Sequence, residues 1–214
     1  MLVSELLFRV KRILLDEELL RWVEQELLDW YNDAIRQVVM LRPDAASVTN
    51  TFTCQPTTRQ TLNVADYRLL DITHNTNGRV IHRIARTALD LNIPNWHGAT
   101  ATALEIEYFV YDEKFPNIFF VYPKPASGVP IEVVTSRLPA PATATDVDIA
   151  LHNIYFNALA DYILHRAFMK DSSAGSITKS EYHHKLFLSA IISKGQSDGD
   201  VSPGMALNSR GNRA

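Results

Sequence analysis

The residues best suited to chemistry in this sequence are four polar side chains in two expected helices. Asp161 and His165 are four positions apart, which places them on one face of a helix, and His183 and His184 are adjacent in the next helix. Carboxylate and imidazole groups are ligands of zinc and iron, so a metal site between these helices is one interpretation. Adjacent histidines point about 100° apart on a helix, however, and could not readily share one ion. We therefore favour a helix-surface pair and solvated histidines.

Other signatures of catalysis and cofactor binding are missing from the sequence. It contains no G-x-x-x-x-G-K loop, no G-x-G-x-x-G fingerprint, no H-E-x-x-H pair and no G-x-S-x-G elbow. Only four of the eight glycines precede residue 195, so the folded part of the sequence has few glycines from which a phosphate-binding loop could form. We expect no enzyme, no cofactor and no bound metal. A small metal-dependent enzyme that uses His165, His183 or His184 is the least favoured alternative.

Composition and charge are those of an ordinary globular protein. The 214 residues are 46% hydrophobic and 21% charged, enough for one large domain or two small ones. The net charge of −3 gives no basic footprint for sequence-specific nucleic-acid binding. Cys54 is the single cysteine, which excludes an intrachain disulfide and favours a reducing compartment. Charges interrupt the apolar first residues, and no apolar run reaches the roughly 20 residues of a membrane span, so we expect synthesis in a cytoplasm and no membrane partner.

The two ends of the chain carry the apolar spacing of helices. The first expected helix is capped by Ser4, and the second runs from Asp16 to Pro43, a length of about 37 Å. A third covers residues 152–170, and a fourth begins at a capping box of Thr178 and Glu181. The predicted buried faces are Leu6, Leu7, Val10, Ile13 and Leu14 in the first helix; Leu20, Val23, Leu27, Trp30, Ala34, Val38 and Leu41 in the second; and Ile154, Ala158, Leu159, Tyr162, Ile163 and Ala167 in the third.

The middle of the chain changes to β-rich runs and turns. The run RVIHRIA (79–85) follows the turn signal HNTNG (74–78). Three further runs are expected to form a three-stranded meander, namely residues 104–112, 117–123 and 131–138. Trp96, in NIPNWHG, is expected to be a core side chain beneath a loop.

The order of helices, strands and helices predicts an α+β fold. A discontinuous helical bundle from both chain ends, with an inserted, mainly antiparallel β domain and an extended C-terminal arm, is the simplest way to bury the apolar faces. The expected boundaries are 1–48 and 147–194 for the two parts of the bundle, 49–146 for the β-rich domain and 195–214 for the arm.

Trp22 is a candidate contact residue. It points away from the apolar stripe of its expected helix and toward Glu18, Gln25, Glu26 and Asp29. A large aromatic side chain on an acidic face often marks a protein interface. The equally weighted alternative is that the short first helix folds back and covers the indole.

The last twenty residues form the second candidate contact. Residues 195–214 contain four glycines, and their composition cannot repay the entropy of ordering by packing on itself. We expect an arm that is ordered by a partner, with Met205 and Leu207 as apolar anchors and Arg210 and Arg213 as donors of charge-assisted hydrogen bonds.

Several segments, taken in order, resemble a known family. They are LLDWYNDAIRQVVMLRPDAAS, RQTLNVADYRLLDITHN, LDLNIPNWHG, YDEKFPNIFFVYPKP and DYILHRAFMKDS. Their combination is similar to the head-to-tail adaptor (connector) proteins of tailed bacteriophages, especially short-tailed ones. The resemblance runs from about Asp16 to Ile192, and its specificity comes from the order and spacing of the segments.

This resemblance implies a structural role without catalysis. Proteins of this family form a ring of about twelve copies between the portal and the tail nozzle of the virion, and leave a channel through which double-stranded DNA passes. A C-terminal arm commonly docks on the portal, which implies a partner for residues 195–214 and a place at the head-to-tail interface. A monomeric module whose β domain binds a peptide or small ligand is the main alternative.

Overall fold

The computed structural model describes residues 1–171 and 174–200. They form two compact units: Met1–Arg42 with the described part of Pro139–Ala214, and Pro43–Leu138. The first is helical and the second is built on β-strands, which confirms the predicted α+β class with its discontinuous helical part. The division falls at 42/43 and 138/139, whereas the sequence suggested 48/49 and 146/147. None of the described helices combines the length and the apolar composition of a membrane-spanning segment.

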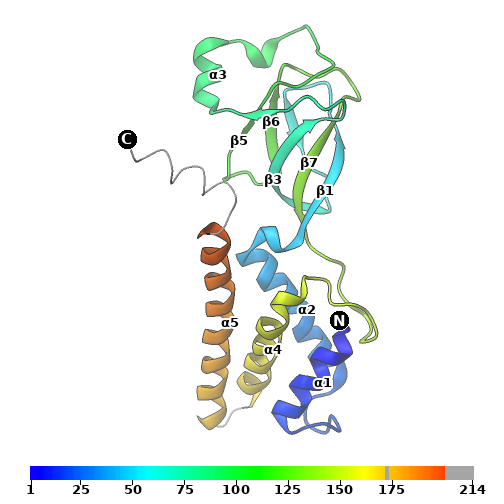
Figure 1. Cartoon of the computed structure of the whole chain (residues 1–214), viewed down its shortest axis with the longest axis vertical. Helices are drawn as coiled ribbons and strands as arrows, with labels where there is room; N and C mark the ends of the chain where they lie inside the picture. The colour runs from blue at the N-terminus through cyan, green and yellow to red at the C-terminus, as the bar shows by residue number, and fades with distance from the viewer. Residues whose placement is uncertain (172–173, 201–214) are drawn as a thin grey trace. The chain divides into compact units, whose positions relative to one another are not determined.

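The helical unit is organised around α4. Its helices are α1 (Val3–Leu14), α2 (Glu24–Leu41), α4 (Phe156–Lys170) and α5 (Ala174–Asp200), with a short 3-10 turn, η3 (Asn153–Tyr155), before α4. α4 packs against α1, α2 and α5 (Figure 1). Its side chains Ala158, Leu159, Tyr162, Ile163 and Ala167 are buried as predicted, while Ile154 is exposed because it lies in η3 before the helix begins.

The start of α2 differs from the prediction. The helix begins at Glu24 rather than after Asp16, so it has 18 residues and spans about 27 Å. Leu27, Trp30, Ala34 and Val38 are buried as expected. The prediction was wrong for Leu20, Val23 and Leu41, which are exposed, because the first two precede the helix and the third ends it.

The first and last helices also begin earlier than predicted. α1 starts at Val3, with the Glu5 carboxylate accepting the backbone N–H of Leu2, so Ser4 is not its cap. Val3, Leu6, Leu7 and Val10 are buried, while Ile13 near the end of the helix is exposed and Leu14 is half-buried.

α5 starts at Ala174, so Thr178 and Glu181 lie inside the helix and form no capping box at its start. The helix continues to Asp200, which corrects the prediction of an extended arm for residues 195–200. Residues 201–214, with Met205, Leu207, Arg210 and Arg213, lie outside the described residues.

The β unit holds two sheets. In the first, β7 (Pro130–Arg137) lies between β1 (Ser47–Thr53) and β3 (Asp66–Asn75), and both pairings are antiparallel. The second has the order β2 (Arg59–Thr61), β6 (Ile118–Tyr122), β5 (Tyr108–Tyr111) and β4 (His82–Arg83). The β4–β5 pairing is parallel, and the others in this sheet are antiparallel. A short 3-10 turn, η1 (Pro43–Ala46), packs on β7 and β3.

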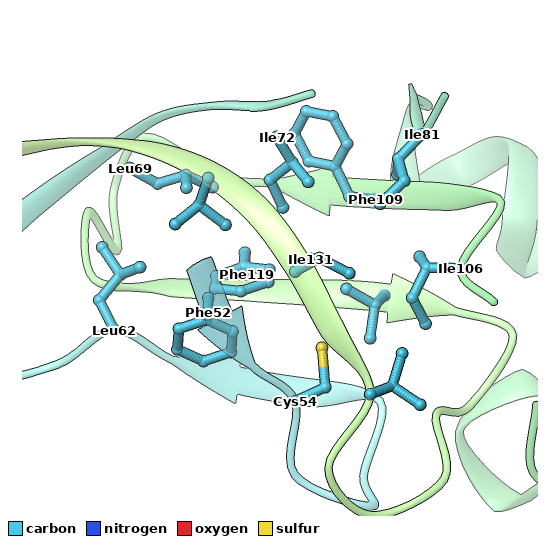
Figure 2. Packing of buried hydrophobic residues seen from close by; sticks show 13 residues of the cluster. Phe52, Cys54, Leu62, Leu69, Ile72, Ile81, Ile106, Phe109, Phe119 and Ile131 are labelled. Carbon is cyan, nitrogen blue, oxygen red and sulfur yellow. The ribbon is translucent and has the colours of Figure 1, made fainter. Parts of the chain in front are cut away.

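The two sheets share one apolar core. Figure 2 shows Phe52 of β1, Phe119 of β6 and Ile131 of β7 among the side chains that meet there, and the Phe52 and Phe119 rings are 5.4 Å apart in an edge-to-face pair. The predicted hairpin of β5 and β6 is present, but the three-stranded meander is wrong because β7 pairs with β1 and β3 instead of β6. Pairing β7 in the opposite sheet lets its alternate side chains close the core from the other side.

Candidate functional site

The predicted contact residue Trp22 is buried. Only 4% of it is exposed, and the Arg21 guanidinium lies 4.6 Å from the centre of its ring. Arg21 also forms a 2.7 Å ion pair with Asp171 at the end of α4. The indole is thus covered within the folded chain, whereas its covering by the first helix and its contact with a partner stay predictions.

The segment around Trp22 is a fixed turn, here called the capped loop (residues 15–23). The Asp16 carboxylate accepts three backbone N–H groups, from Leu20, Arg21 and Trp22, at 2.9–3.0 Å. These hydrogen bonds hold the pKa of Asp16 below its ordinary value, and the bond from the Trp22 N–H has the largest effect. Leu15 and Leu19 have positive φ angles of 57°, which ends α1 and delays α2.

The capped loop presents apolar side chains to solvent. Leu15 is 91% exposed and Leu20 is 86% exposed, and Val23 at the start of α2 is also exposed. Glu17 and Glu18 are exposed beside them. Because the Asp16 hydrogen bonds fix the backbone, a partner could bind these side chains at a small entropic cost. The loop is therefore a candidate contact surface.

The histidines form interhelical contacts between α4 and α5. The His165 Nδ1 lies 2.9 Å from the Ser180 hydroxyl and 3.1 Å from its carbonyl oxygen, and the His165 ring stacks on His184 at 4.5 Å. The His183 Nδ1 lies 2.9 Å from the Asp161 carboxylate. Asp161 and His165 thus have separate partners on α5 and do not act together.

Each of these histidines has a partner within the helical unit. Burial lowers the pKa of His165, and the neighbouring His184 and Arg166 lower it further. In the part of the chain that the structure describes, no three His, Cys, Asp or Glu side chains are grouped to hold a metal ion. The arrangement is suited to joining two helices.

The β unit carries a groove that the sequence did not predict. It has a volume of about 1190 Å³ and is lined by β2, β4, β5, β6, the start of α3 (Arg86–Asn92) and the hairpin that joins β5 to β6. Val110, Ile118 and Phe120 supply its apolar lining, and Phe115 of the hairpin, 57% exposed, stands at its edge. We call this feature the β-unit groove.

Trp96 was predicted to be a core side chain, and this is confirmed: it lies in the apolar layer behind the groove. Trp96 is 1% exposed and packs with Leu89 of α3 and Val110 of β5. Its Nε1–H donates to Asp90 at 2.9 Å. This packing holds α3 against the sheet, and Arg86 at the start of α3 lines the β-unit groove.

The rim of the β-unit groove is mainly basic. Four cationic side chains line it, Arg59, Arg83, Arg86 and Lys114, against two acidic ones, Asp112 and Glu113. The Arg86 guanidinium lies over the Phe120 ring at 5.9 Å and that of Arg83 over Tyr111 at 5.9 Å. Asp112 accepts the backbone N–H of Lys114, and Glu113 faces Arg68 at 3.9 Å.

Sequence reasoning missed the groove because its residues come from separated segments. The basic rim draws on β2, β4, α3 and the β5–β6 hairpin, which no local spacing connects. The one sequence signal was that Arg59 and Lys114 each lie in a segment that carries the family resemblance.

A comparison with protein-family models finds a match that covers nearly the whole chain. The family model described as "SU10 adaptor protein" matches residues 1–210, which is nearly the whole chain. No curated protein matches the chain.

Proposed function

We propose, from the premise that this chain belongs to the SU10 adaptor protein family, that it forms a ring of about twelve copies between the portal and the tail nozzle of a phage virion. Membership of this family makes the chain a structural phage adaptor. From this membership we infer the ring, its position between the portal and the tail nozzle, and its channel. An adaptor needs several contact surfaces rather than one active site, and both units expose large apolar side chains, such as Leu20 in one and Leu104 in the other.

The proposed portal contact is the segment 201–214. Met205 and Leu207 are its apolar anchors, and Arg210 and Arg213 would donate hydrogen bonds to carboxylates or carbonyl groups of the portal. Burying the two apolar side chains contributes roughly 3–6 kcal/mol, most of which is offset by the cost of ordering the segment. A single contact would therefore be weak.

Ring formation makes weak contacts sufficient. Once one segment has bound, the others in the same ring are held near their sites, so each later contact is effectively intramolecular. The chain carries 24 acidic and 21 basic residues, a balance that allows a neutral or repulsive channel wall along which DNA can slide.

The test is deletion of residues 201–214, which leaves α5 whole. We expect an unchanged melting temperature and ring, with attachment to purified portal abolished or strongly weakened in a sedimentation assay. As a matched control, a variant that keeps the length but replaces Ser202 and Ser209 by Ala should bind like the full chain. Truncated protein that attaches to portal as tightly as the full chain would refute the role of this segment.

A further inference from the structure

The β-unit groove combines an apolar floor with four cations, one of which, Arg86, has an acidic partner. Within the described residues, no carboxylate forms an ion pair with Arg59, Arg83 or Lys114. Among the residues that the structure describes, Arg86 forms an ion pair with Asp90 alone, at 3.4 Å, and both side chains are exposed on the short helix α3. Exposed cations beside partly buried aromatic rings are a common feature of surfaces that bind another protein.

We propose that the β-unit groove binds an acidic protein segment, one with carboxylates spaced between apolar side chains. The apolar side chains would lie against Val110, Ile118 and Phe120, and the carboxylates would pair with Arg59 and Lys114 on the rim. A bidentate Arg–carboxylate pair fixes the position of such a segment, and the basic rim speeds its approach. The volume of about 1190 Å³ accommodates several side chains of the partner.

Charge and apolarity decide between the possible occupants. The segment 201–214 of this chain contains Arg210 and Arg213 and no acidic residue, so its charge has the same sign as the rim. Duplex DNA offers phosphates but no apolar side chains, and it would leave Phe115 and the floor of the groove uncovered. An acidic, partly apolar protein segment satisfies both features.

The experiment measures binding of a fluorescein-labelled peptide of alternating glutamate and leucine to the full chain by fluorescence anisotropy. The comparison variant is Arg59→Glu with Lys114→Glu, both on exposed side chains of the groove. The matched control, Arg12→Glu with Lys185→Glu, changes the net charge equally on exposed sites of the helical unit. We expect the groove variant to bind about tenfold more weakly or worse, the control to bind as the parent does, and parent affinity to fall with salt.

A second variant tests the apolar part of the groove. Phe115→Ala alters a side chain that is 57% exposed, so the fold should tolerate it, and peptide binding should weaken several-fold. Equal binding by all variants, equal binding of a peptide with lysine in place of glutamate, or preference for a short DNA duplex would overturn the proposal. A groove variant that changed self-association and not peptide binding would also overturn it, by assigning the groove to a second copy.

Discussion

Replacing Leu27 by Ala tests how α2 is oriented in the helical unit. Leu27 is fully buried, with 0% exposed, on a helix that packs against α4. The substitution removes three carbon groups from the core, and at about 0.8 kcal/mol each their transfer from water accounts for about 2.4 kcal/mol. The cavity left behind adds to this loss, and Leu→Ala changes in cores cost about 2.7–5.0 kcal/mol in total. We expect the free energy of unfolding of the helical unit to fall by about 3–4 kcal/mol.

Leu20→Ala is the matched control, because it makes the same chemical change at a side chain that is 86% exposed. The expected change there is under about 0.5 kcal/mol. Urea unfolding followed by far-UV circular dichroism reports mainly on the helices, and the long helices of the chain lie in the helical unit. Equal destabilisation by the two substitutions would refute the assignment of the buried face.

Two further outcomes follow from buried titratable groups. Burial raises the pKa of the Cys54 thiol to about 12, so a thiol reagent should leave it unmodified in the folded protein and react only after unfolding of the β unit; rapid modification under native conditions would contradict the packing of this residue. Burial between α4 and α5 lowers the pKa of His165, which lies beside Ser180, His183 and His184 of α5 and Arg166 of α4. The contribution of His165 to the free energy of unfolding is therefore full above its unfolded-state pKa of about 6.5. That contribution is lost as the pH falls toward the lower pKa of the folded state. Urea unfolding at a series of pH values should show a flatter dependence for His165→Gln than for the parent, and identical slopes would contradict this.

The helices show what local sequence patterns can and cannot predict. The three-four spacing located the buried face of α2 from Leu27 to Val38, because those positions lie in one continuous helix. The same spacing failed at Leu20 and Val23. There the Asp16 carboxylate binds three backbone N–H groups, and two leucines at positive φ interrupt the helix. An acidic residue before an apolar stripe is equally typical of a helix cap and of a capped turn, so the sequence alone favoured the wrong one.

The sheets show the same limit at longer range. The HNTNG signal identified a true turn, where the Asn75 N–H donates to the Arg79 carbonyl and Gly78 has a φ of +97°. The β5–β6 hairpin was also local and was predicted. The partners of β7 are β1 and β3, which precede it by many residues, and their pairing depends on closing a core from both sheets. The β-unit groove depends on the same assembly of distant segments, so it could not be predicted from local sequence patterns either.

The two contact sites proposed for this chain have a property in common that the overall charge conceals. The chain carries a net charge of −3, yet both the β-unit groove and the segment 201–214 are positively charged. The excess of acidic residues is therefore carried by the rest of the chain. If the proposals hold, both partners need carboxylates at the joint, and both joints should weaken as salt increases. The same distribution leaves acidic groups available for a channel wall that repels the phosphates of DNA. Placing cations at the joints and anions elsewhere would let one chain bind its protein partners firmly and bind DNA only weakly.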